Sequence, residues 1–257
     1  MAPLLAPLAD VDLEAAYAHP AGAGAGTAAG AGTAAGGGWL RANVVSSLDG
    51  AVAVDGSSRG LGTEPDQRVL RLLRDLADAV LVGAGTARAE GYVALTGTSE
   101  RRAARAARGL APAPALVVVS ASLDLDPAGP LVAGPPSRTL VVTSEEAAAS
   151  PAGQRLGEAV ELVPVGEGAV DVVAAVRALH ERGLRRVLCE GGPTLLGHVA
   201  AAGLLDELCL TLSPAVVGGA AGRVLRAPAL RVGMEPAHVL AADDGTLLTR
   251  WVRRDRG

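Results

Sequence analysis

The chain has 257 residues, a formal net charge of −4 and 49% hydrophobic residues, and this length suits one substantial domain with a single core. The negative charge and an aromatic content of 2% exclude a nucleic-acid partner, which would need a basic surface and rings for base stacking. No apolar run is long enough to span a bilayer, and the N-terminus does not resemble a secretion signal. We therefore expect a cytoplasmic protein with no membrane partner.

The first 38 residues are expected to lie outside the main domain. An apolar segment from Leu4 to Tyr17 favours a short helix. An Ala/Gly/Thr-rich tract from Pro20 to Gly38 follows it, and this composition is typical of a flexible linker. The main domain is predicted to span residues 39–257.

From Trp39 onward, strand-like and helix-like segments alternate. The predicted strands are Leu40–Ser46, Ala79–Val82, Leu116–Ser120, Thr139–Thr143, Val160–Val165, Arg186–Cys189, Glu207–Leu212, Ala237–Ala241 and Thr246–Val252. The predicted helices are Pro65–Leu76, Glu145–Leu156, Val170–Arg182 and Thr194–Ala202. This order predicts an α/β fold of three layers, in which helices cover both faces of a mostly parallel central sheet. Asp243-Asp244-Gly245 is a turn signal between the last two strands, which should form an antiparallel hairpin.

The most informative motif is Glu190-Gly191-Gly192-Pro193-Thr194-Leu195, which reads as the end of a strand, a glycine turn and a helix start. Proline suits the first helical turn because its missing N–H would have no partner there. The free N–H groups and the positive end of the helix dipole favour a bound phosphate or pyrophosphate. Glu190 ends the strand, at the edge where open α/β sheets place their ligands. The motif predicts an anion site beside a carboxylate.

A second strand-then-glycine turn lies at Val82-Gly83-Ala84-Gly85-Thr86. It departs from the dinucleotide fingerprint because Arg88 occupies the sixth position, where the fingerprint has glycine. Two interpretations stay open: a phosphate-facing turn with Thr86 and Arg88 as donors, or a tight turn beside a packed helix.

Three polar residues elsewhere also have two interpretations. Asn43 is the only asparagine, and it either serves the site or bonds a neighbouring loop from an edge strand. Asp49-Gly50 follows a strand, and its two interpretations are a site residue or only a turn, which is the usual role of an Asp-Gly pair at such a position. Arg74 lies on an amphipathic helix, where arginines usually face solvent.

Residues that commonly bind metals or act as nucleophiles carry no such signal here. Cys189 and Cys209 lie in apolar strand-like runs, without disulfide or zinc spacing, and are predicted to be buried thiols. No two histidines have the spacing of a helical metal pair, so no metal is expected. The chain contains no lysine, so phosphates must be held by arginine or by backbone N–H groups.

Several motifs in this order resemble the riboflavin-biosynthesis pyrimidine reductase family, whose fold is dihydrofolate reductase-like. The resemblance covers roughly Trp39 to the C-terminus. The motifs are Ser47-Leu48-Asp49-Gly50, Gly62-Thr63-x-x-Asp66 before the Leu-Leu-Arg74 helix, Val82-Gly83-Ala84-Gly85-Thr86-x-x-x-Glu90, the Glu190–Leu195 block, and Leu205-Asp206-Glu207-Leu208 with Pro214 and Gly218-Gly219.

This resemblance implies an NADPH-dependent reductase, and a homodimer, that converts the ribosyl group of a phosphoribosylamino-pyrimidine to a ribityl chain by hydride transfer to C1′. The implied roles are catalysis for Asp49, Asn43 and Glu190, and substrate binding for Arg74, Glu190 and Arg59. The expected cofactor-binding residues are Thr63, Thr86, Glu90, Ser120, Gly191, Gly192, Pro193, Thr194 and Leu195; Ser120 is a candidate for a 2′-phosphate.

Three departures from the family pattern lie on the substrate side. Asn43 replaces a lysine, Leu61 replaces a tryptophan, and Arg59 stands at a small polar position. A same-fold NADPH reductase of another heterocycle, such as dihydrofolate, therefore stays an alternative, as does a non-catalytic nucleotide-binding protein. The zinc deaminase motifs His-x-Glu and Pro-Cys-x-x-Cys are absent, so a stand-alone reductase is expected.

Overall fold

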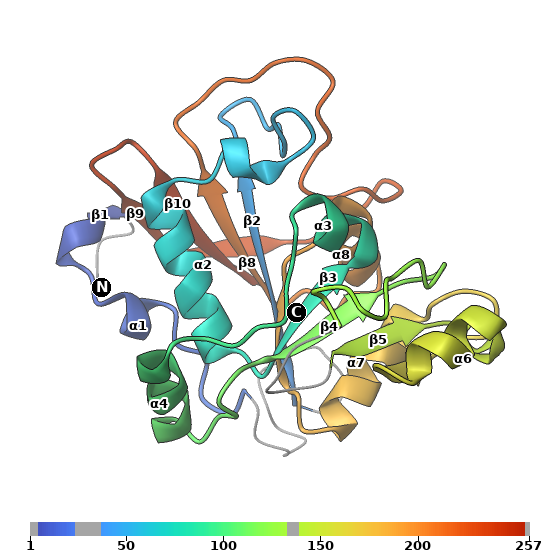
Figure 1. Cartoon of the computed structure of the whole chain (residues 1–257). Coiled ribbons are helices and arrows are strands. Elements are labelled where there is room, and N and C mark those ends of the chain that lie inside the picture. Colours follow the sequence, from blue (N-terminus) through green and yellow to red (C-terminus); the bar gives the residue numbers. More distant parts are fainter. Residues whose placement is uncertain (1–4, 24–36, 133–138, 255–257) are drawn as a thin grey trace.

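The computed structural model describes residues 5–23, 37–132 and 139–254. At its centre is a ten-stranded sheet with the order β1-β9-β10-β8-β2-β7-β3-β4-β5-β6 (Figure 1). The strands are β1 (Leu5–Pro7), β2 (Trp39–Ser46), β3 (Ala79–Gly83), β4 (Ala115–Val119), β5 (Leu140–Thr143), β6 (Glu161–Pro164), β7 (Arg186–Cys189), β8 (Glu207–Leu212), β9 (Met234–Ala241) and β10 (Leu247–Arg253).

The sheet is parallel except at β10, which runs antiparallel to both of its neighbours, β8 and β9. The predicted C-terminal hairpin is confirmed, and its turn is closed by the bond from the Ala242 N–H to the Thr246 carbonyl. Gly245 in this turn has a φ of +87°, a conformation that glycine adopts without steric cost. The mostly parallel sheet with a C-terminal antiparallel hairpin is therefore as predicted.

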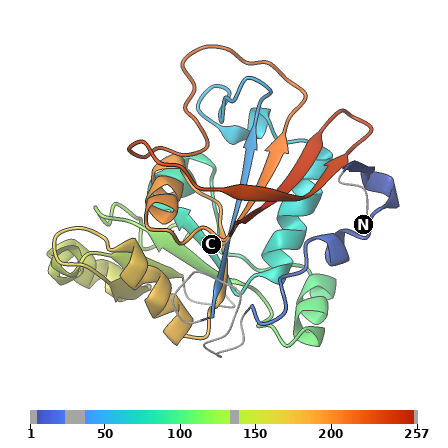
Figure 2. The ribbon, with the colours of Figure 1, turned by 180° about the vertical axis from the view of Figure 1, so that it is seen from behind.

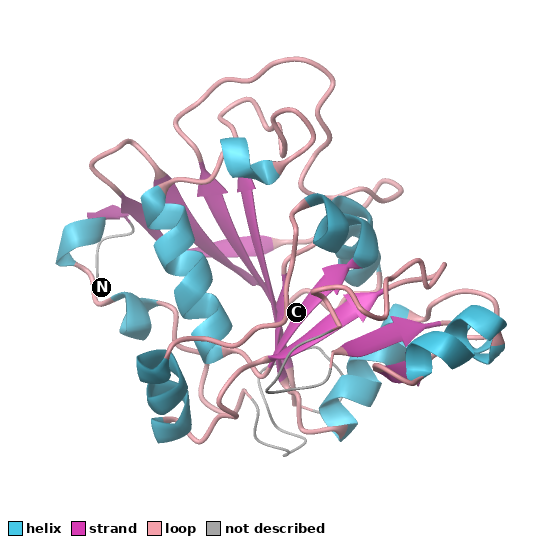
Figure 3. Ribbon diagram, in the orientation of Figure 1, coloured by secondary structure: helices cyan, strands magenta, loops and turns pink. Residues whose placement is uncertain are grey.

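Helices cover both faces of the sheet (Figures 2 and 3). They are α1 (Leu13–Ala16), α2 (Glu64–Leu76), α3 (Ala84–Ala89), α4 (Ser99–Ala107), α5 (Glu145–Ala149), α6 (Pro151–Gly157), α7 (Val172–Glu181) and α8 (Pro193–Ala201). The core on one face includes Leu73 of α2 and Leu156 of α6, whereas the core on the other includes Leu179 of α7 and Leu196 of α8. The three-layer α/β architecture is confirmed.

The strand register decides which polar side chains face α2. Asn43 is in register with Cys209, whose side chain belongs to the core that α2 covers. Leu188 belongs to the same core, and Glu190 follows it by two residues. Since side chains alternate between the faces of a sheet, Asn43 and Glu190 project toward the α2 layer.

The N-terminal segment differs from its prediction. A single helix from Leu4 to Tyr17 was expected, but the described residues form β1, a 3₁₀ turn at Leu8–Asp10 and the short α1. The strand β1 pairs with β9, so this segment extends the sheet. Most of the Pro20–Gly38 tract lies outside the described residues, and the linker and the domain boundary at residue 38 stay predictions.

Two further differences concern helices. The helix expected at Glu145–Leu156 is divided into α5 and α6 at Ser150, because Pro151 lacks the N–H that a continuous helix would use. The helices α3 and α4 were not predicted. Within the described residues, no helix is long and apolar enough to cross a bilayer. Both cysteines are buried and free, as expected.

Candidate functional site

A cavity of about 870 Å³ lies at the carboxyl ends of the central strands, between α2 and the sheet. Its walls come from β2, α2, α3, the turn after β7, the start of α8, and the two segments that follow β2 and β8. These two segments arch over the strand ends in Figure 1. Ligands of open α/β sheets bind at this edge, so the cavity is the candidate site.

Glu190 and Arg74 form a bidentate ion pair in this cavity. Arg74 Nε donates to Glu190 Oε1 at 2.7 Å, and Nη2 donates to Oε2 at 2.6 Å. The Tyr92 hydroxyl also donates to Oε2, and the Arg74 guanidinium lies 5.4 Å from the centre of the Tyr92 ring. Both oxygens of the buried Glu190 side chain therefore have partners, and the plane of the guanidinium is fixed.

This cluster keeps Arg74 positively charged. Burial alone would lower the pKa of Arg74, but Glu190 outweighs that effect and raises it. Burial and the same carboxylate raise the pKa of Tyr92, so its hydroxyl keeps its proton. Arg74 uses two of its five N–H donors on Glu190, which leaves donors for an anionic ligand.

The glycine turn after β7 lies directly against Thr86. Gly192 caps α8, and Pro193 is the first residue of that helix. A Cβ added to Gly192 would lie 2.2 Å from Thr86 Oγ1, so no side chain fits at this position without displacing the threonine. Gly191, Gly192, Pro193 and Thr86 all line the cavity.

The segment after β8 is attached to the start of α8. The Arg226 N–H donates to the Pro193 carbonyl at 2.8 Å, and a Cβ on Gly197 would lie 1.9 Å from the Arg226 carbonyl oxygen. This close packing brings Arg226 to the wall of the cavity beside Gly192.

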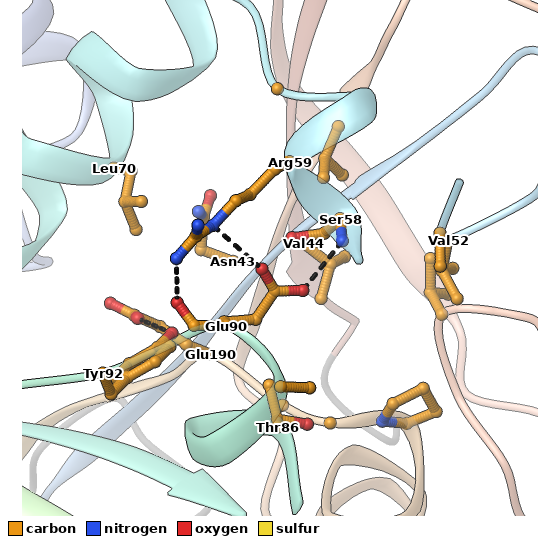
Figure 4. Close-up of a pocket in the computed structure, with 18 of the residues that line it drawn as sticks. Asn43, Val44, Val52, Ser58, Arg59, Leu70, Thr86, Glu90, Tyr92 and Glu190 are labelled. Carbon is orange, nitrogen blue, oxygen red and sulfur yellow. Dashed lines mark hydrogen bonds and ion pairs between the residues drawn. The ribbon is translucent and has the colours of Figure 1, made fainter. Parts of the chain in front are cut away.

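Glu90 is held by the segment that follows β2 (Figure 4). Its carboxylate accepts from the Ser58 N–H at 2.7 Å and from the Ser57 hydroxyl at 3.0 Å. Arg59 Nη2 donates to the Glu90 carbonyl at 2.5 Å, and the Arg59 side chain is 72% exposed. Glu90 and Arg59 both line the cavity, and in this arrangement they link α3 to the segment above it.

Two buried polar side chains, one from β2 and one from α2, also line the cavity. Asn43 projects from β2 and is 9% exposed, and Asp66 projects from the first turn of α2 and is 5% exposed. Burial raises the pKa of Asp66, and a hydrogen bond with Thr211 of β8 offsets part of this effect.

Five of the expected site residues lie outside the cavity lining. Asp49 accepts from the N–H groups of Val217 and Gly218, and with Ser47 these bonds lower its pKa to about 2. Its carboxylate thus ties the segment after β2 to the segment after β8. Since this leaves it away from the cavity, a catalytic role for Asp49 stays a prediction.

The other four residues have local roles in the structure. Thr63 caps α2 by accepting from the Asp66 N–H, and Ser120 accepts from the Leu123 N–H while only 3% exposed. The Leu195 side chain is buried in the core, and Thr194 is exposed beside it. Their expected contacts with a cofactor stay predictions, and for Leu195 only the backbone is suited to one.

Sequence reasoning missed Tyr92, Asp66 and Arg226 as cavity residues. Tyr92 is one of two tyrosines in a chain that is poor in aromatics, so the rarity that drew attention to Asn43 applied to it equally. Asp66 entered the sequence analysis only as part of the Gly62-Thr63-x-x-Asp66 motif, which does not by itself place it on the cavity face of α2. The sequence around Arg226 carries no periodic signal that would have placed it.

The site as a whole has the character of a cofactor-binding α/β enzyme. It combines a backbone-lined glycine turn suited to phosphates with a fixed guanidinium and a buried carboxyl group. In the described part of the chain, no group of three or more His, Cys, Asp or Glu side chains is placed to hold a metal ion.

Comparison with known proteins assigns the chain to a family. The family model described as the RibD C-terminal domain matches residues 38–248. A 2,5-diamino-6-ribosylamino-4(3H)-pyrimidinone 5′-phosphate reductase from Archaeoglobus fulgidus is 31% identical over 178 residues, which are 69% of this chain and 80% of that protein. A protein of the same name from Methanothermobacter thermautotrophicus is 29% identical over 78% of this chain and 93% of its own length. The chain therefore belongs to the RibD C-terminal domain family.

A solved structure has the same architecture. A pyrimidine reductase-like protein from Corynebacterium diphtheriae superposes with a TM-score of 0.77 and 25% identity, covering 85% of this chain and 93% of that one. The resemblance found in the motifs is thus confirmed, as is the expectation of an oxidoreductase.

Proposed function

We propose that this protein is an NADPH-dependent reductase that acts on a ribosylaminopyrimidine 5′-phosphate of riboflavin biosynthesis. The observation that carries the proposal is the pairing of two anion-binding features in one cavity, the glycine turn at Gly192 and the guanidinium of Arg74. A nicotinamide dinucleotide and a phosphorylated substrate together require two such features. The names of the relatives supply the substrate class.

The residues present fit the cofactor. The space that a Cβ at Gly192 would fill is bordered by Thr86, and backbone N–H groups at the start of α8 are suited to a pyrophosphate. When bound, the cofactor supplies the hydride. Thr86 and the turn from Gly191 to Pro193 would hold it.

The chain's own part in the reaction is binding and orientation. Arg74, fixed by Glu190 and Tyr92, would hold the substrate phosphate. This attachment would set the ribose C1′ for hydride attack and let the cavity walls exclude water. In the overall reaction a C–H bond forms at C1′, the bond from C1′ to the ring oxygen breaks, and that oxygen takes up a proton.

The test of this proposal is oxidation of NADPH in the presence of the ribosylaminopyrimidine phosphate. Turnover of the pyrimidine with formation of the ribityl product supports it. Turnover of dihydrofolate in place of the pyrimidine would favour the same-fold alternative, and NADPH binding without turnover of either compound would favour a non-catalytic nucleotide-binding protein.

The proposal includes a homodimer in the cytoplasm. The face of β8 and β10 opposite α2 carries half-buried apolar side chains, among them Leu210, Leu212 and Trp251. In Figure 2 no helix covers this part of the sheet. Burial of such a surface against a second copy is energetically favourable.

A further inference from the structure

One stripe of α2 faces the cavity and carries three different chemical groups. Asp66, Leu70 and Arg74 are spaced four residues apart, so they lie in a row on one side of the helix, and all three line the cavity. Figure 4 shows Leu70 in this cavity. Eight residues of helix span about 12 Å. The stripe thus presents a carboxyl group at one end, an apolar contact in the middle and a cation at the other end.

This order matches a nucleotide-like substrate laid along the helix. With the phosphate at Arg74, the heterocycle lies toward Asp66, and Leu70 lies between them. In the described part of the chain no arginine pairs with Asp66, whereas Asp75 on the same helix pairs with Arg101 at 2.8 Å. A buried carboxylate without a cation is costly unless hydrogen-bond donors compensate it. Thr211 supplies one such donor, and a ligand is suited to supply the others.

The two candidate pyrimidines differ at the edge of the ring. A 2-amino-4(3H)-pyrimidinone presents two neighbouring donors, the 2-amino group and N3–H, which match the two oxygens of a carboxylate. A uracil presents a carbonyl oxygen at C2 beside N3–H. An ionised carboxylate facing that edge would set one oxygen against another, which is repulsive and leaves a buried acceptor unpaired.

We propose that Asp66 is the residue that recognises the pyrimidine ring and that it selects the 2-amino compound over the corresponding uracil. The carboxylate accepts from the 2-amino group and from N3–H, while Thr211 holds its orientation. This inference rests on the proposed function and specifies which ribosylaminopyrimidine the enzyme reduces.

The deciding variant is Asp66→Asn. An asparagine side chain offers one donor and one acceptor, which is the complement of the uracil edge and a mismatch for the 2-amino edge. We expect the wild-type protein to favour the 2-amino compound by about 100-fold in kcat/KM, and Asp66→Asn to abolish or reverse this preference. NADPH affinity should stay within about twofold, because the substitution changes a side chain on α2 and not the turn from Gly191 to Pro193.

Glu64→Gln is the matched control. Glu64 lies in the same first turn of α2 but is exposed, so the variant removes an equal charge from the helix start without changing the cavity. We expect its substrate preference to equal that of the wild type. An equal loss of preference in both variants would assign the effect to the helix terminus and overturn the proposal.

The remaining outcomes separate this inference from the proposed function. An enzyme that reduces a pyrimidine with no preference, or with one that Asp66→Asn leaves unchanged, would overturn the role of Asp66 and leave the proposed function standing. Reduction of neither pyrimidine would overturn both. If Asp66→Asn does not fold, Thr211→Val serves in its place. This variant removes the partner of the carboxyl group and should lower the preference several-fold, and an unchanged ratio would contradict the proposal.

Discussion

At the scale of single residues, Glu190 positions the side chain of Arg74. The motif predicted a carboxylate beside an anion site, and the structure places it in a bidentate pair with Arg74 and a bond from Tyr92. Its chemical effect is therefore to fix a guanidinium in one plane. A phosphate bound by a pre-oriented arginine loses less side-chain freedom than one bound by a mobile arginine.

The first prediction concerns the Glu190→Gln variant. An amide has one acceptor in place of two and carries no charge, so the bidentate pair with Arg74 is lost. We expect kcat/KM for the pyrimidine to fall about 10- to 100-fold, the range for a hydrogen bond to a charged group. NADPH affinity, measured by calorimetry, should change much less. Equal losses of turnover and of NADPH affinity would refute the assignment of Glu190 to the substrate side.

The second prediction concerns Gly192→Val. A Cβ at this position would meet Thr86 Oγ1 at 2.2 Å, and the valine methyl groups would occupy the space next to the turn. We expect NADPH affinity to fall below detection by calorimetry while the protein stays folded. Gly157→Val at the end of α6 is the control, because a Cβ there makes an ordinary 3.6 Å contact with Leu162 far from the cavity. Unchanged NADPH affinity in Gly192→Val would remove the turn from the cofactor site.

At the scale of elements, a buried charge cluster joins β2, β8 and β10. Glu207 pairs with Arg41 at 2.6 Å and with Arg250 at 2.8 Å, and it accepts from the Trp39 indole N–H at 2.9 Å. Burial alone would raise the pKa of Glu207, but the two arginines outweigh it and lower the pKa to about 2. The cluster lies at the amino ends of β2 and β8, whereas the site lies at their carboxyl ends.

The third prediction is that Glu207→Gln destabilises the protein in a pH-dependent way. Removing the carboxylate leaves two buried arginines without an anion, which costs about 3–5 kcal/mol. The depressed pKa means that this stabilisation is present above about pH 4.5 and declines as the pH falls toward 2. The difference in unfolding free energy between wild type and variant, from urea titrations, should be constant near neutrality and shrink below pH 4.5. A difference that stays constant throughout would contradict this account.

Most elements were predictable because their patterns are local. The strands and the hairpin follow from apolar runs and from the Asp-Asp-Gly turn, and α2 follows from its amphipathic spacing. The division of α5 from α6 was also readable at Pro151, because a proline cannot continue a helix that begins at Glu145. The strand β1 was not predictable, since its pairing with β9 joins segments more than 200 residues apart.

The site was predictable only in part, for a similar reason. The glycine turn and Thr86 belong to sequence-local motifs, and both line the cavity. The contacts of Glu190 with Arg74 and Tyr92 come from three separate elements, so only the fold brings them together. Asp49 illustrates the reverse case, in which a family motif binds two loops to each other.

At the scale of the whole molecule, the open face of β8 and β10 leads to the fourth prediction. We expect light scattering to give twice the chain mass, and Leu210→Arg to give the monomer, because a charge in an apolar interface is not compensated. A wild-type protein that is monomeric at all concentrations would contradict the homodimer.

The central claim is that one cavity holds a nicotinamide cofactor and a ribosylaminopyrimidine phosphate together. Its most direct test follows NADPH absorbance with the 2-amino pyrimidine as substrate and identifies the product by mass spectrometry. The account predicts oxidation of one NADPH for each ribityl product, which is heavier than the substrate by two hydrogen atoms. NADPH binding without oxidation by either pyrimidine would contradict it.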